Sequence, residues 1–100
     1  MSNLVHLEPI YGDRAYVLRV YEPGYSFEAS SPYQASATVE VTGSTARVYG
    51  MSGNAFTAAQ YRDFLRQLAE RGIDRLEYTH NGRPTVVRYL AERWQMQPRQ

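Results

Sequence analysis

Hydrophobic and polar residues alternate most clearly over residues 37–49, and this pattern predicts a β-hairpin. If Gly43-Ser44 is a two-residue turn, Glu40 lies directly opposite Arg47 in the neighbouring strand. One face of the hairpin is then apolar and carries Ala37, Val39, Val41, Ala46 and Val48. A slip of one residue would bury the charged side chains, so we expect one buried face, one wet face and a fixed register.

Two further strands are expected before this hairpin. Residues 4–7 form a short apolar segment that we expect Pro9 to stop. Residues 15–21 alternate regularly, with one face made of Tyr16, Leu18 and Val20. The segment 22–34 contains two prolines, a glycine and three serines and is predicted to be a loop.

A helix is predicted after Phe56. Thr57 and Gln60 have the spacing of a capping box, and Gly72 stands where a left-handed residue ends a helix. The apolar stripe between them consists of Tyr61, Phe64, Leu65 and Leu68, and the opposite side carries Arg62, Asp63, Arg66, Gln67 and Glu70. We expect the polar side to be solvated, with a partner site there as the alternative.

Asn81-Gly82 predicts a second hairpin, in which Leu76 faces Val87 and Tyr78 faces Thr85. Pro84 places the last strand at an edge or leaves that position unpaired. Beyond residue 90 the tail is expected to form a short helix or arm. Its Trp94 is either a local packing anchor or a partner contact.

These elements predict an α+β fold in the order β-β-β-β-α-β-β: an antiparallel-rich sheet of five to six strands with one main helix on one face. One hundred residues fit a single domain, here 1–90, followed by the tail 91–100. No apolar run approaches the ~18 residues of a membrane span, and no signal peptide is apparent at the start. We therefore expect the cytoplasm of the producing cell, or incorporation in a virion.

The composition is rich in arginine and tyrosine, two residues that are common in protein interfaces. All eleven basic residues are arginine, none is lysine, and nine residues are tyrosine. Two explanations of the arginines stay open. One is a GC-rich genome, and the other is use in interfaces, where arginine pairs with planar groups. Three aromatic residues of the 22–34 loop either cap an open end of the core or form a recognition surface: Tyr25, Phe27 and Tyr33.

Catalytic and metal chemistry find little support in the sequence. There is no cysteine, and His6 and His80 are not at metal-ligand spacing, so we expect no metal and no cofactor. The carboxylates each have an expected arginine neighbour, which leaves none free for acid–base work: Glu40, Asp63, Glu70 and Glu77. The segment 50–53 lacks the spacing of a nucleophile elbow and is expected to be a connecting loop.

The segment from Arg47 to Leu76 resembles the middle of GNAT-type acyltransferases, with a strand, a glycine-bearing loop, a helix and another strand. In that family an Arg/Gln-x-x-Gly-x-Gly/Ala loop binds the pyrophosphate of acetyl-CoA. The resemblance would give this role to Arg47, Gly50, Met51 and Ser52, with Ser52 in place of the final small residue. The segment looks more like the small GNAT-like proteins of tailed phages, in which the cofactor loop is degenerate, than like a working acetyltransferase.

The leading hypothesis is a non-catalytic protein that binds another protein or itself, such as a virion accessory component or a host-directed inhibitor. The expected contact residues are Tyr25, Phe27, Tyr33 and Trp94, and secondarily Arg47 and Tyr49 on the wet sheet face. One alternative is an acetyl-CoA-dependent N-acyltransferase that uses the loop described above. Another is a nucleic-acid binder that uses Arg62, Arg66 and Arg71, although Asp63 and Glu70 dilute their charge.

Overall fold

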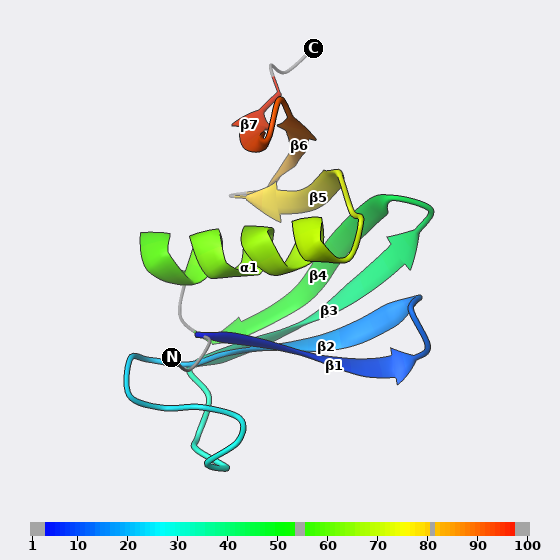
Figure 1. The fold of residues 1–100 in the computed structure, drawn as a ribbon. Coiled ribbons are helices and arrows are strands. Elements are labelled where there is room, and N and C mark those ends of the chain that lie inside the picture. Colours follow the sequence, from blue (N-terminus) through cyan, green and yellow to red (C-terminus); the bar gives the residue numbers. More distant parts are fainter. Residues whose placement is uncertain (1–3, 54–55, 81, 98–100) are drawn as a thin grey trace.

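The computed structural model describes residues 4–53, 56–80 and 82–97. This part of the chain forms one sheet and one helix (Figure 1). The elements are β1 (Val5–Tyr11), β2 (Ala15–Val20), β3 (Ala35–Thr42), β4 (Thr45–Gly53), α1 (Ala58–Glu70), β5 (Arg75–His80), β6 (Arg83–Leu90) and β7 (Arg93–Met96). The expected α+β class is confirmed, and the sheet has seven strands where five to six were expected.

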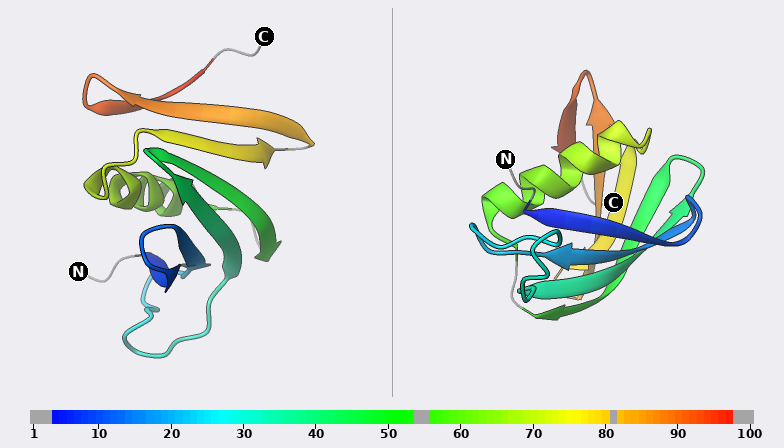
Figure 2. Two further views of the ribbon diagram at one scale, coloured as in Figure 1. Left: turned by 90° about the vertical axis from the view of Figure 1, so that its right-hand side faces the viewer. Right: turned by 60° about the horizontal axis from the view of Figure 1, so that its bottom comes forward.

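The strands lie side by side in chain order. Neighbours are antiparallel except β4 and β5, which are parallel because α1 carries the chain back between them. The sheet curls around the helix, so that β1 to β4 pass beneath α1 while β5 to β7 rise beside it (Figures 1 and 2). We call the face toward α1 the inner face and the opposite one the outer face.

The core lies between the inner face and α1. Its largest fully buried apolar side chains come from both layers and include Leu18, Val20, Val39, Phe64, Leu68 and Leu76. Each such side chain contributes about 1.5–3 kcal/mol relative to an exposed position. The inner face of the sheet therefore fixes where the helix packs.

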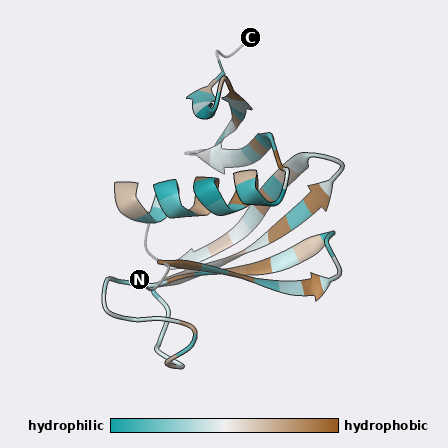
Figure 3. Cartoon of the chain, viewed as in Figure 1, coloured by the Kyte–Doolittle hydropathy of each residue, from teal (hydrophilic) through white to brown (hydrophobic). Residues whose placement is uncertain are grey.

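Both predicted hairpins have the expected register. Glu40 lies opposite Arg47, and Leu76 lies opposite Val87. Apolar and polar bands alternate along the strands beneath the helix (Figure 3), as a sheet with one buried face requires. Asn81, the first residue of the second predicted turn, lies outside the described residues.

The first strand does not stop at Pro9 but continues to Tyr11. The main-chain oxygen of Leu4 accepts the N–H of Tyr21 at 2.8 Å, so these two residues form a hydrogen-bonded pair. Bonded pairs recur at every second residue of an antiparallel ladder, and Pro9 falls at an alternate position whose main-chain groups point to the free edge. Its missing N–H therefore costs no bond within the sheet.

β4 also runs further than expected, through the segment 50–53 that was predicted to be a loop. Thr38 pairs with Tyr49 but Ser36 pairs with Ser52, so β4 holds one extra residue there. Gly50 has a φ of 70°, which makes this a glycine-dependent β-bulge. The pairing of β4 with β5 covers Thr45–Arg47 and ends before the bulge.

The tail forms β7 rather than a helix or a free arm. Ala91 and Glu92 both have positive φ angles, 52° and 64°, and make the tight turn from β6. β7 pairs with β6 from Val87 onward, and the Gln97 N–H adds a bond to the Val86 oxygen at 2.9 Å. Within the described chain Pro84 therefore pairs with β5 on one side and has no strand on the other. Proline is tolerated at such an edge position because it has no N–H to donate.

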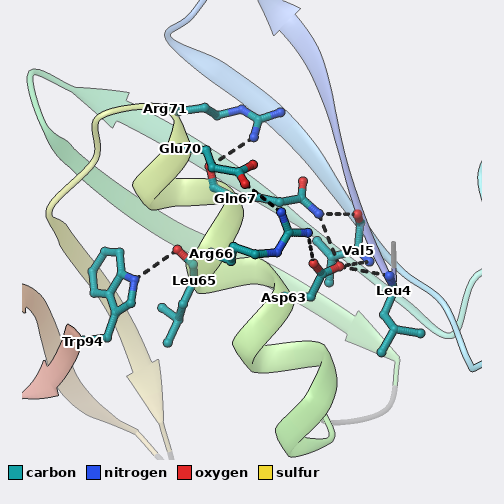
Figure 4. A network of polar contacts seen from close by, with 9 residues as sticks. All are labelled: Leu4, Val5, Asp63, Leu65, Arg66, Gln67, Glu70, Arg71 and Trp94. Carbon is teal, nitrogen blue, oxygen red and sulfur yellow. Dashed lines mark hydrogen bonds and ion pairs between the residues drawn. The ribbon is translucent and has the colours of Figure 1, made fainter. Parts of the chain in front are cut away.

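The helix has the expected capping box and left-handed Gly72, but part of its polar side is not solvated. Asp63 Oδ2 accepts the N–H groups of Leu4 and Val5 at 2.9 and 3.1 Å. Gln67 is buried and donates to the Val5 oxygen at 2.7 Å (Figure 4). The prediction of a solvated side is wrong for these two residues, because they supply hydrogen bonds to the edge of β1.

Candidate functional site

The loop between β2 and β3 is held at its base by Gln60, whose side chain is almost fully buried. Gln60 Nε2 donates to the main-chain oxygen of Tyr21 and to Gln34 Oε1, both at 3.0 Å. Tyr21 precedes the loop and Gln34 ends it, so one side chain of α1 fixes both ends. Gln60 Oε1 also accepts the Thr57 N–H at 2.8 Å, which links this clamp to the helix cap.

The loop is held in shape by hydrogen bonds between its own residues, most of which involve a serine. Ser26 is buried, and its hydroxyl oxygen accepts the Ala29 N–H at 3.2 Å while its main-chain oxygen accepts the Ser31 N–H at 3.1 Å. The Ser30 N–H donates to the Phe27 oxygen at 2.9 Å. These local bonds make residues 22–34 a compact loop, which lies beyond the sheet on the side away from α1 (Figure 1).

Two loop rings pack on side chains of the outer face. His6 and Phe27 stack with ring centroids 3.7 Å apart and planes 5° apart. The guanidinium of Arg19 lies 5.8 Å from the ring centroids of both Phe27 and Tyr33. His6 and Arg19 are directly opposite each other in β1 and β2. We call His6, Arg19, Phe27 and Tyr33 the aromatic platform.

The loop aromatics are exposed rather than inserted into the core. Tyr25 is 46% exposed, Phe27 38% and Tyr33 53%. Tyr21, directly before the loop, is by contrast only 2% exposed. Of the two interpretations of the loop, these exposures favour a surface.

A shallow pocket adjoins the platform along the edge of β1. Its volume is about 140 Å³, and it is lined by Val5, His6, Leu7, Phe27, Glu28, Gln67 and Arg71. Pockets for small ligands and cofactors typically occupy about 300–1,000 Å³. We therefore interpret this pocket as a recess at the rim of the platform.

The second expected surface, around Arg47 and Tyr49, is held in a polar network. Arg47 bonds to Glu77 at 3.1 Å, and Tyr49 donates to Glu40 Oε2 at 3.0 Å. Glu40 and Arg47 are opposite in register, yet the ion pair expected between them is replaced by these two contacts. Arg75 also bonds to Glu77, at 2.8 Å, and together the two arginines lower the pKa of that carboxyl group.

Trp94 lies against the helix. Its Nε1–H donates to the Leu65 oxygen at 3.0 Å, and its ring centroid is 5.4 Å from that of Tyr89. Trp94 is half-buried and packs against the core. These contacts support the interpretation of Trp94 as a packing anchor.

The residues of the family-like loop are not gathered at a helix N terminus. Arg47, Gly50, Met51 and Ser52 all lie inside β4. Arg47 is six residues before the end of that strand, which is about 20 Å along an extended chain. The capping box already uses the main-chain N–H of Gln60, one of the donors that a phosphate would need.

The helix arginines that suggested nucleic-acid binding are partly engaged within the helix. Arg66 bonds to Asp63 and Glu70. Arg71 donates to the Gln67 oxygen at 3.1 Å and lies 5.5 Å from the Tyr16 ring centroid. These contacts leave Arg62 as the helix arginine for which the described residues show no such engagement.

Two residues of the platform, His6 and Arg19, were not predicted from the sequence. His6 Nε2 lies 3.0 Å from Glu8 Oε2, and within the described residues no group of three potential metal ligands is found. A sequence signal exists for Arg19, which lies in the strand directly before the aromatic-rich loop, whereas no signal in the sequence places His6 beside that loop. The side chain of His80 lies outside the described residues.

In the described ranges, no helix has the length and apolar character needed to cross a membrane. Comparison of the chain with protein-family models, with curated proteins and with solved structures gives no match.

Proposed function

We propose that the chain is a non-catalytic protein-binding module, and that its partner docks on the aromatic platform and the adjacent Tyr25. The observation that supports this most is that three aromatic rings of one loop are exposed to solvent although the loop is held in place. Ring stacking and hydrogen bonds hold it. Tyrosine and arginine are enriched among the residues that dominate the binding energy of protein interfaces, and phenylalanine is enriched in their composition.

Fixation of the loop matters because binding to a mobile loop costs conformational entropy. Ordering one side chain on binding costs about 0.5–1.5 kcal/mol, and main-chain ordering adds to this. Here Gln60 and Phe27 already hold the base and the body of the loop. The contact energy of the rings would therefore appear largely as affinity.

The proposed partner is another protein or a second copy of this chain. The resemblance to small tailed-phage proteins extends the proposal to a virion accessory component or a host-directed inhibitor. An acetyl-CoA-dependent acyltransferase remains the alternative. Micromolar binding of acetyl-CoA in a calorimeter would favour it over the binding module.

The test compares two triple variants of the tagged chain. One replaces Tyr25, Phe27 and Tyr33 with alanine. The control replaces Ile10, Tyr11 and Met96, which are 56%, 67% and 63% exposed and lie outside the loop.

Size-exclusion chromatography with light scattering and capture from producing-cell and host lysates are then run on both variants and the wild type. We expect the control to retain the self-association or the captured protein and the loop variant to lose it. A wild-type chain that stays monomeric and captures nothing would contradict the proposal, as would a loop variant that behaves like the control.

A further inference from the structure

Arg19 occupies the centre of the platform and is held by its neighbours. Its guanidinium lies over the rings of both Phe27 and Tyr33. In the sheet register its direct neighbours on the outer face are His6 in β1 and Ser36 in β3. Contact with two rings limits the orientations of the guanidinium plane and leaves its N–H edge for an acceptor.

Within the described residues the Arg19 guanidinium makes no hydrogen bond or ion pair, although its charge acts on the Tyr21 hydroxyl. Arg47, Arg66 and Arg75 each bond to a carboxylate, whereas the contacts of Arg19 are with aromatic rings. A guanidinium carries five N–H donors, and Arg19 is half-buried, so part of its hydration is already lost. An acceptor arriving from outside would find donors already arranged for a planar, two-pronged contact.

The surroundings of Arg19 favour a single carboxylate over a polyanion. Glu8 bonds to His6 beside it, and Glu28 lines the neighbouring pocket. These carboxylates would repel a chain of phosphates such as a nucleic-acid backbone. The exposed Phe27 and Tyr33 rings instead offer apolar contact to the residues that flank one acidic side chain.

From this geometry we infer that Arg19 receives an aspartate or glutamate side chain of the partner, in a segment where apolar or aromatic residues flank the acid. The inference rests on the proposed function, since it names the chemistry of the segment that docks on the platform. Arg19 would select the partner, and the rings would supply contact area on either side of the ion pair.

The probe is a capped pentapeptide, Ala-Phe-Glu-Phe-Ala, and its counterpart with glutamine at the centre. Both are titrated into ¹⁵N-labelled protein while the Arg19 side-chain N–H signal is followed. The variants are Arg19→Gln, Arg19→Lys and the control Arg62→Gln, which removes the same charge from the exposed side of α1. Thermal unfolding of each variant confirms that it is folded.

We expect the glutamate peptide to shift the Arg19 signal and the glutamine peptide to bind at least about tenfold more weakly. Arg19→Gln should weaken binding of the glutamate peptide by a similar factor, and Arg19→Lys by less. Arg62→Gln should leave binding within about twofold. Equal binding of the two peptides, or equal binding by Arg19→Gln and the control, would overturn the inference.

Two further arms separate other anions. Inorganic phosphate or a single-stranded oligonucleotide that shifts the Arg19 signal, where the glutamate peptide does not, would also overturn the inference.

If the loop triple variant loses a captured partner that Arg19→Gln still binds fully, the role of Arg19 fails and the proposed function stands. If the loop variant keeps the partner, the proposed function itself fails.

Discussion

The indole Nε1–H of Trp94 in β7 donates to the main-chain oxygen of Leu65 in the middle of α1, at 3.0 Å. Across the molecule, Asp63 and Gln67 of the same helix bond to the main-chain N–H and oxygen of Val5, the first residue of β1 (Figure 4). β1 and β7 are the first and last strands of the sheet. The helix therefore ties both edges of the curled sheet.

Replacing Trp94 with phenylalanine keeps an aromatic ring but removes the hydrogen bond to Leu65. We expect Trp94→Phe to lower the free energy of unfolding by about 1 kcal/mol. Urea unfolding followed by circular dichroism measures this. Met96→Ala, in the same strand at an exposed position, should change the free energy by less than about 0.5 kcal/mol, and an equal loss in both variants would argue against the tie.

Asp63 and Glu70 both bond to Arg66, but only Asp63 also accepts the N–H groups of Leu4 and Val5 at the start of β1. Asp63→Ala leaves two main-chain donors at the edge without that acceptor, so we expect a loss of about 2–3 kcal/mol. Glu70→Ala removes a surface ion pair and should cost less than about 0.5 kcal/mol. Similar losses in the two variants would show that the helix does not support the edge.

The pKa of Glu77 lies below its usual value of 4.5, because Arg75 and Arg47 donate hydrogen bonds to the carboxylate. A carboxyl group with a depressed folded-state pKa stabilises the fold above its unfolded pKa. This stability is lost as the pH falls from about 4.5 through the lower folded-state pKa. Denaturant unfolding between pH 7 and pH 2.5 should therefore show a smaller acid-induced loss for Glu77→Gln than for the wild type. Identical pH profiles would contradict this.

Arg88 lies directly opposite Arg75, and its Nε is buried with no hydrogen-bond partner in the described chain. Like charges opposite each other destabilise a sheet, and an unpaired buried donor adds a desolvation cost. We expect Arg88→Met, which keeps an apolar stem, to raise the free energy of unfolding by about 0.5–1 kcal/mol. Arg93→Met at an exposed position of β7 serves as the control in the same denaturant series. A destabilised Arg88→Met variant would show that its guanidinium has a stabilising contact.

The register of the first hairpin could be predicted because any slip would bury Glu40 or Arg47. The helix ends could be predicted because Thr57, Gln60 and Gly72 each have a specific local role. The turn before β7 could not, since neither Ala91 nor Glu92 favours a positive φ. The β4 bulge was missed because a glycine within an alternating segment also fits a loop.

The candidate site was less predictable than the fold. Aromatic content in the loop pointed to Phe27 and Tyr33, but a loop has no periodicity that would give its position on the sheet. The stack of His6 on Phe27 joins residues 21 positions apart, and no local pattern links them. Helical periodicity gave the polar side of α1, but not that Asp63 and Gln67 lie beside the free edge of β1.

Hydrogen exchange measured by mass spectrometry, with and without the bound partner or at concentrations above and below self-association, tests the binding surface most directly. The proposed function predicts slower exchange in residues 22–34 and in β1 and β2, with β6 and β7 unchanged. Slower exchange confined to α1 or to β6 and β7, with residues 22–34 unaffected, would contradict it.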